Sequence, residues 1–131
     1  MIISVIIPVY NAGENLRVLI DKIEQNLINL EFQSEIIIID SQSTDGSTDF
    51  ITIEKPEINL INIKNDDFNH GGTRNLGADI AEGNILVYIT QDALPYDDSS
   101  IKNLIEPIIV DERIAMSYGR QLPHKNADYF G

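Results

Sequence analysis

The stretch Ile2-Ile3-Ser4-Val5-Ile6-Ile7-Pro8-Val9 is a nearly continuous run of apolar, mostly β-branched residues. Such a run is typical of a strand that is buried on both faces, as in a parallel sheet covered by helices. A second run, Glu35-Ile36-Ile37-Ile38-Ile39-Asp40, predicts another buried strand of the same kind. These two strands indicate that the chain is built around an α/β sheet.

Amphipathic segments alternate with shorter apolar runs along the rest of the chain. We expect helices over 16–30, over a short segment after the 41–48 loop, over about 73–81, and from a cap at 97–99 to Pro107. We expect further strands at 58–64, 84–90 and 114–118. This alternation predicts an α/β fold with a doubly wound, mostly parallel, Rossmann-like sheet.

Length and composition limit the possible partners. The chain has 131 residues, which is typical of one domain, and no cysteine, which excludes a disulfide scaffold, thiolate zinc sites and a cysteine nucleophile. Its formal net charge of −12 argues against nucleic acid as a partner and means that an anionic ligand must be bound locally. The apolar start has no basic region and is interrupted by Pro8, so we expect no targeting segment and a cytoplasmic protein.

Polar residues follow the expected strands. In doubly wound sheets, ligands bind outside the carboxyl ends of the strands, at the point where the strand order reverses. We therefore expect one crevice to be lined by four segments: Pro8-Val9-Tyr10-Asn11, Asp40-Ser41, 66–74 and Thr90-Gln91-Asp92.

Two aspartates at these strand ends each have two interpretations. Asp92 would hold a divalent cation, since Mg²⁺ and Mn²⁺ prefer oxygen ligands and substrate phosphates, or it would bond to backbone N–H groups of the following turn. Asp40 would accept a hydrogen bond from a base or ribose, or it would cap the loop that follows it. For Asp40 the spacing favours the cap.

The segment that opens the third expected helix contains unusual residues. Gly71 and Gly72 would let the backbone approach an anionic ligand at the helix N-terminus. Arg74 is expected in the first turn, where a cation is unfavourable to the helix dipole, so either an anionic or carbonyl partner attracts it or it pairs with a neighbouring aspartate. His70 would donate to a ligand or pack within the loop.

Taken together, these motifs resemble the family 2 inverting glycosyltransferases, which have the GT-A nucleotide-sugar-binding fold. The opening strand through Asn11 looks like the first strand and nucleotide-binding turn of that family. The stretch Asp40-Ser41-Gln42-Ser43-Thr44-Asp45-Gly46 is similar to the family's Asp-Asp-Gly-Ser-Thr-Asp, with Ser41 and Gln42 as departures. Thr90-Gln91-Asp92 lies at the Asp-x-Asp-type metal motif, with Gln91 in place of an acidic residue.

The resemblance implies a role for several of these residues. Asp40 or Ser41 would read the pyrimidine, and Arg74 would lie at the nucleotide. Asp92 would hold a divalent cation, Mg²⁺ or Mn²⁺, at the diphosphate. The other candidate substrate-binding residues are Pro8, Val9, Tyr10, Asn11, His70, Gly72 and Gln91.

Two segments, Phe68-Asn69-His70-Gly71-Gly72-Thr73-Arg74-Asn75 and Tyr118-Gly119-Arg120-Gln121-Leu122-Pro123, look like parts of bacterial rhamnosyltransferases within this family. This likeness implies a nucleotide-sugar donor, dTDP-L-rhamnose or a UDP-linked sugar. It also implies a saccharide or lipid-linked acceptor and a role in polysaccharide or O-antigen synthesis. A lipid-linked acceptor would bring the full-length enzyme to the inner face of the membrane as a peripheral protein.

Family members carry their general base in the second half of the enzyme, with the acceptor site. We therefore expect residues 1–131 to form a single donor-binding domain portion, truncated before the acceptor half. On this expectation the chain has no catalytic residue of its own, and the base lies beyond Gly131. It would bind the donor without transferring the sugar.

Three other functions stay open. A sugar nucleotidyltransferase would carry a glycine-rich, basic loop after the first strand, yet no basic residue occurs there before Arg17. A phospho-receiver module would carry paired acids at that strand end, where this chain has Pro8-Val9-Tyr10. A non-catalytic nucleotide-binding or scaffold domain could share the same fold. In every nucleotide-binding case the acidic charge predicts that binding depends on a metal ion.

Overall fold

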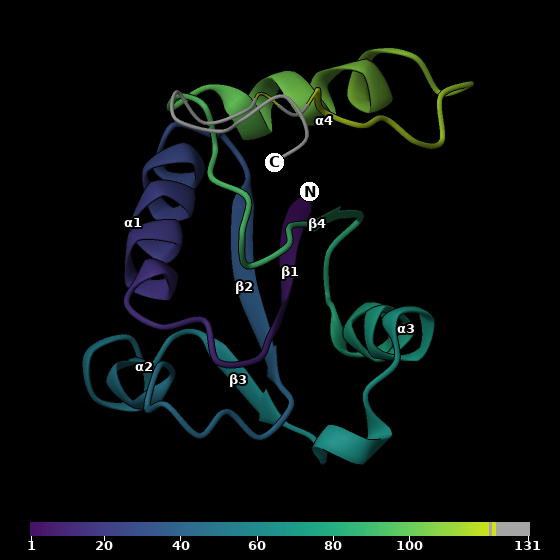
Figure 1. Ribbon diagram of the computed structural model, residues 1–131. Helices are drawn as coiled ribbons and strands as arrows, with labels where there is room; N and C mark the ends of the chain where they lie inside the picture. The colour runs from purple at the N-terminus through teal and green to yellow at the C-terminus, as the bar shows by residue number, and fades with distance from the viewer. Residues whose placement is uncertain (121, 123–131) are drawn as a thin grey trace.

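The computed structural model describes residues 1–120 and 122, and its centre is a parallel sheet (Figure 1). Its strands are β1 (Ile2–Val9), β2 (Gln33–Asp40), β3 (Asn59–Asn62) and β4 (Ile85–Tyr88), in the order β3-β2-β1-β4. Every neighbouring pair of these strands is parallel. The two β-branched runs thus form the central strands, and the predicted parallel sheet is confirmed.

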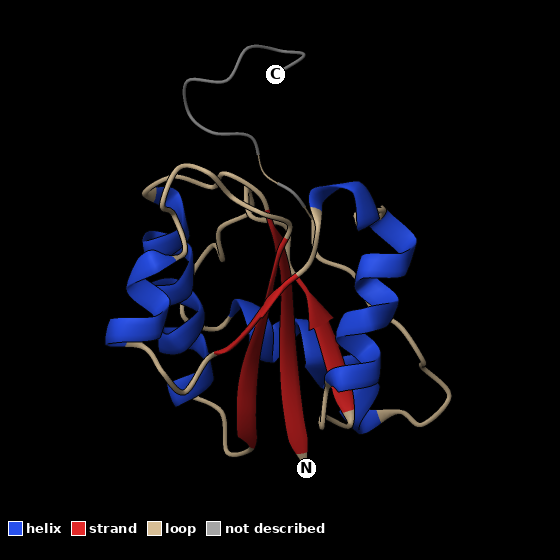
Figure 2. Ribbon diagram, turned by 90° about the horizontal axis from the view of Figure 1, so that it is seen from below, coloured by secondary structure: helices blue, strands red, loops and turns tan. Residues whose placement is uncertain are grey.

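Helices cover both faces of the sheet, as Figure 2 shows. The helices are α1 (Asn15–Ile28), α2 (Asp49–Glu54), α3 (His70–Ile80) and α4 (Ser100–Val110), with a 3-10 turn at Asn65–Asp67. Buried residues of α1, α2 and α4 belong to one core cluster, whereas α3 packs against the second cluster on the opposite face. This two-sided cover is the predicted doubly wound arrangement.

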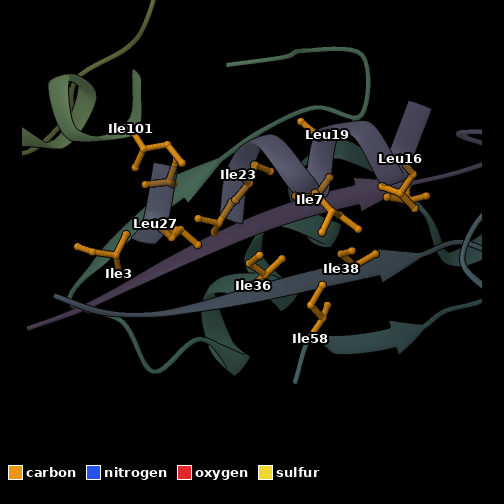
Figure 3. Close-up of a cluster of buried hydrophobic side chains, with 14 of the residues drawn as sticks. Ile3, Ile7, Leu16, Leu19, Ile23, Leu27, Ile36, Ile38, Ile58 and Ile101 are labelled. Carbon is orange, nitrogen blue, oxygen red and sulfur yellow. The ribbon is translucent and has the colours of Figure 1, made fainter. Parts of the chain in front are cut away.

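The alternation of side chains along the central strands divides the core into these two clusters. Ile7 and Ile38 face α1, where Leu19 packs against them in the larger cluster (Figure 3). Ile6 of β1 and the β2 residues on either side of Ile38 point the opposite way, toward α3. The smaller cluster contains Ile6, Ile37 and Ile39, with Leu76 and Ile80 of α3 packed against it.

Helix α3 begins three residues earlier than the sequence predicted. Asn69 is its N-cap, and the Asn69 side chain accepts a hydrogen bond of 2.6 Å from the N–H of Gly72. An asparagine cap satisfies one of the free N–H groups at a helix start, so Gly71 and Gly72 lie inside the first turn. The prediction that Arg74 lies in the first turn is therefore wrong, because it follows the first four helical residues.

The end of the chain also differs from the prediction. Helix α4 continues past Pro107 to Val110, and the carbonyl of Pro107 accepts from the N–H of Asp111 at 3.2 Å. Proline removes one helical hydrogen bond, and the buried Ile105 on the preceding turn still anchors the helix to the core.

The strand predicted at 114–118 is not found. The Ile114 N–H closes a turn onto the carbonyl of Asp111, and the Ser117 hydroxyl bonds to the carbonyl of Leu104 in α4. The segment therefore runs back along α4 and does not reach the sheet. Within the described residues, no helix has the length and apolar character needed to cross a bilayer.

Candidate functional site

A cleft of about 310 Å³ lies at the carboxyl ends of β1 and β4. The chain passes from β1 to β2 on one side of β1, and β4 pairs with the other side, so the strand order reverses between β1 and β4. Ligands of doubly wound sheets bind at this kind of position. The cleft is lined by Pro8, Val9, Tyr10, Phe68, His70, Arg74, Thr90, Gln91 and Asp92. Seven of the predicted site residues are therefore brought together.

Asp92 presents an exposed carboxylate to the cleft. In the part of the chain that the structure describes, this side chain makes no hydrogen bond, so the alternative of a carboxylate bonded to its own turn is not observed. The described residues contain no group of three or more His, Cys, Asp or Glu side chains arranged to hold a metal. A single carboxylate fits a cation that also takes oxygen ligands from a bound phosphate, as Mg²⁺ commonly does.

Arg74 supplies the positive charge of the cleft. The residue is half-buried, and its Nη1 donates to the carbonyl of His70 at 3.2 Å. Over residues 1–120 and 122 it forms no ion pair, so the predicted alternative of a pair with a neighbouring aspartate is not found. The hydroxyl of Tyr88 donates to the carbonyl of Arg74 at 3.2 Å, which ties this turn of α3 to β4. A guanidinium held this way is available to an anion.

Gln91 does not face the cleft with a free amide. Its Oε1 accepts from the backbone N–H of Tyr10 at 2.8 Å, and its Nε2 donates to the backbone carbonyl of Tyr10 at 3.0 Å. Both polar atoms of the side chain are thus used within the protein, although the residue lies in the segment that resembles the metal motif.

Asp40 and Ser41 lie outside the cleft. The Asp40 carboxylate is buried, and it accepts from the N–H and hydroxyl of Ser43 at 3.0 and 2.6 Å and from the Thr48 hydroxyl at 3.1 Å. The Ser41 hydroxyl is buried and donates to the carbonyl of Val9 at 3.3 Å. These contacts match the capping interpretation of Asp40, and they leave neither side chain facing the cleft.

The other two predicted residues hold loops. The Asn11 side chain accepts from the N–H of Thr44 at 2.7 Å, and its own N–H donates to the Ser43 hydroxyl at 2.9 Å. Asn11 has a φ of 46°, in the left-handed region that asparagine tolerates. Gly72 is engaged by the Asn69 cap. Neither residue lines the cleft.

Phe68 and Thr90 lie within segments that were expected to line the crevice, but they were not named individually as substrate-binding residues. The Phe68 ring packs edge-on against His70, with ring centroids 5.2 Å apart and an interplanar angle of 76°. The available signal was position: Phe68 follows the turn after β3, and Thr90 precedes Asp92 at the end of β4. His70, a predicted site residue of the same segment, is exposed and lines the cleft beside Phe68.

The sequence matches a protein-family model. Glycosyl transferase family 2 is matched over residues 4–127. The O-antigen chain rhamnosyltransferase RfbN of Salmonella typhimurium is 42% identical over 98% of this chain and 40% of its own length. The O-antigen chain rhamnosyltransferase WbaN of Salmonella anatum is 35% identical over 95% of this chain and 38% of its own length. The chain thus spans about two-fifths of these curated relatives.

Solved structures share the fold. TarS 1-349 of S. aureus, in complex with UDP-GlcNAc, has a TM-score of 0.63 and 22% identity. The match covers 95% of this chain and 37% of the TarS chain. Glucosyl-3-phosphoglycerate synthase of Mycobacterium tuberculosis, in complex with Mn²⁺, UDP and glucosyl-3-phosphoglycerate, has a TM-score of 0.65 and 23% identity over 86% of this chain and 41% of its own. The expected fold class is confirmed by this likeness.

Proposed function

The chain belongs to glycosyl transferase family 2, and from this membership we propose that residues 1–131 are the donor-binding portion of an inverting rhamnosyltransferase. The donor is a nucleotide sugar, dTDP-L-rhamnose, and the acceptor is a saccharide or lipid-linked chain in O-antigen or related polysaccharide synthesis. The names of the two Salmonella relatives support the sugar and the product class. A lipid-linked acceptor would place the whole enzyme in the cytoplasm at the inner face of the membrane.

The observation that carries the proposal is the convergence of Tyr10, Arg74 and Asp92 on one cleft at the reversal of strand order. A nucleoside diphosphate is anionic, and the protein as a whole carries a net charge of −12. Binding therefore needs local positive charge. Arg74 provides one such charge, and Asp92 provides an oxygen ligand through which a divalent cation can provide another.

Transfer with inversion is a single in-line displacement at the anomeric carbon, and the nucleoside diphosphate leaves. Arg74 would stabilise the negative charge that grows on this leaving group. Asp92 would hold the divalent cation, Mg²⁺ or Mn²⁺, which supplies Lewis-acid stabilisation of the same charge when bound. Tyr10 would form one wall of the cleft against the donor. The general base that deprotonates the acceptor is proposed to lie in the acceptor half of the whole protein.

A thermal-unfolding screen tests the proposal. dTDP, UDP, CTP and acetyl phosphate are each added with and without Mn²⁺. We expect dTDP with Mn²⁺ to give the largest rise in Tm, because a ligand that binds only the folded chain stabilises it by about 2.7 kcal/mol at about 100 times its Kd. Stabilisation by CTP alone would favour a nucleotidyltransferase, and stabilisation by acetyl phosphate alone would favour a phospho-receiver. If no nucleotide raises Tm, the proposal is wrong.

A further inference from the structure

Gln91 forms a two-point contact with the backbone of Tyr10, a residue 81 positions away in the chain. The two hydrogen bonds, 2.8 Å to the N–H and 3.0 Å to the carbonyl, use both backbone polar groups of Tyr10. This is the pattern that a neighbouring strand would offer, supplied here by a side chain.

The contact lies where the two strands separate. The β1–β4 pairing runs from Ile3 with Ile85 to Ile6 with Tyr88, and the Ile89 N–H adds a last bond of 3.1 Å to the carbonyl of Ile6. Pro8, farther along β1, has no N–H to offer. The cleft opens beyond this point, and Gln91 reconnects the two chain segments across it.

Only a side chain that both donates and accepts can make this contact. A primary amide has an N–H₂ donor and a carbonyl acceptor, whereas an ionised carboxylate only accepts. An acidic residue at position 91 would place a negative charge against the carbonyl oxygen of Tyr10. The chemistry of the contact thus accounts for an amide at a position where the resemblance predicts an acid.

We propose that Gln91 is a positioning residue of the donor site, which holds Tyr10 on one side of the cleft and its chain neighbour Asp92 on the other, and that it is not a cation ligand. This inference rests on the proposed function. It assigns cation binding in this segment to Asp92 alone, and it makes the separation between Tyr10 and Asp92 depend on an uncharged amide.

The variant Gln91→Glu distinguishes positioning from ligation by the sign of its effect. Affinity for dTDP in the presence of Mn²⁺ is measured by calorimetry at about pH 8 for the wild type and the variant. At about pH 8 the introduced carboxylate cannot donate to Tyr10, so we expect binding about tenfold weaker than in the wild type.

Gln25→Glu introduces the same charge at an exposed position of α1, away from the cleft. It is the matched control and should bind dTDP with Mn²⁺ as the wild type does.

Two results would overturn the inference. If Gln91→Glu binds Mn²⁺ and dTDP more tightly at about pH 8, position 91 is a ligand position. If the affinity equals that of the wild type, the contact does not position the site.

Amide hydrogen exchange in the ligand-free chain gives a separate readout. We expect the Tyr10 N–H to exchange at least about tenfold faster in Gln91→Ala, with the amides of the β1 interior unchanged. Unchanged exchange at Tyr10 would overturn the inference independently of nucleotide binding. If the wild type does not bind dTDP at all, the proposed function fails, and the exchange result still decides whether Gln91 holds Tyr10.

Discussion

The carboxylate of Asp45 accepts a hydrogen bond from the backbone N–H of Gly13 at 3.0 Å, and this bond joins the loop after β1 to the loop after β2. Its other oxygen accepts from the N–H of Ser47 at 3.0 Å. Asn11 adds a second connection between the same loops, through Thr44. Because the first loop begins at Tyr10, these bonds fix the backbone that enters the cleft.

This relationship predicts an acid-dependent loss of stability. The hydrogen bonds from Ser47 and Gly13 hold the pKa of Asp45 below its usual value of 3.8. A carboxyl whose pKa is lower in the folded state stabilises the fold above its unfolded pKa, and this stabilisation is lost as the pH falls through the folded pKa. The urea midpoint of the wild type should therefore exceed that of Asp45→Asn at about pH 6, and the difference should shrink below about pH 4.

The exposed Asp98→Asn provides the control for this titration. We expect its urea midpoint to follow that of the wild type across the same range. A difference between wild type and Asp45→Asn that grows on acidification would contradict the assignment of the loop contacts to the ionised carboxylate.

Replacement of the buried Asp40 is expected to reduce stability more than replacement of Asp45. Asp40→Ala leaves the Ser43 N–H and the hydroxyls of Ser43 and Thr48 without their shared acceptor, so we expect the free energy of unfolding to fall by about 3 kcal/mol. Asp40→Asn keeps an acceptor and should cost about 1 kcal/mol. Urea unfolding measures both, and Asp79→Ala on the exposed face of α3 is the control. Equal losses for the two Asp40 variants would contradict this account.

The sequence predicted the interior of the fold well because burial there depends on a local pattern. Both bounds of β1 were predicted, since a β-branched run buried on both faces has few other interpretations. The edge strands β3 and β4 have four residues each and are shorter than predicted, although the N–H groups of Ile63 and Ile89, just beyond them, still bond to the neighbouring central strands. The predicted strand at 114–118 failed for a non-local reason, the attachment of Ser117 to α4.

Three of the four segments expected at the crevice do line the cleft, since parallel strands bring their carboxyl ends to one edge of the sheet, but Asp40-Ser41 does not. The roles of the individual residues were harder to predict. Whether the Asp40 carboxylate faces a ligand or its own loop depends on Ser43 and Thr48. Both residues are close to Asp40 in the sequence, so the spacing already favoured the cap. The partner of Gln91 lies 81 residues away, and no spacing rule shows a contact between a side chain and a distant backbone.

The close approach of α3 to the sheet predicts opposite effects for two glycines of one helix. A Cβ at Gly77 would lie 2.6 Å from Cγ2 of the fully buried Ile6, so Gly77→Ala should lower the free energy of unfolding by about 1–3 kcal/mol. A Cβ at Gly71 would meet nothing closer than 4.0 Å, so Gly71→Ala should raise it by about 0.5–1 kcal/mol. Thermal unfolding of both variants checks the pair, and destabilisation by both would contradict it.

The side chain of the buried Asn26 connects α1 to α4, and its hydrogen bonds predict how much this connection stabilises the fold. Its Nδ2 donates to the carbonyls of Lys22 and Asp97, and its Oδ1 accepts from the N–H of Ile101 at the start of α4. Asn26→Ala leaves the buried N–H of Ile101 without its acceptor and removes the donor to the two carbonyls, so we expect a loss of about 2–3 kcal/mol in urea unfolding. Gln25→Ala, the exposed neighbour, should cost less than about 0.5 kcal/mol. Similar losses for the two would show that α4 is held by its apolar contacts alone.

Asp92 predicts the metal dependence of donor binding. With Mn²⁺ present, Asp92→Ala should weaken dTDP binding by about tenfold or more, because the cation loses its protein ligand and the diphosphate then faces the net negative protein with Arg74 alone. Without Mn²⁺ the wild type and the variant should bind equally weakly. Calorimetry with and without the ion measures this, and the exposed Asp98→Ala should behave as the wild type. Because Asp92 is itself exposed and makes no hydrogen bond within the described residues, Tm without ligand should not change. An unchanged effect of Mn²⁺ in Asp92→Ala would show that the cation is held elsewhere.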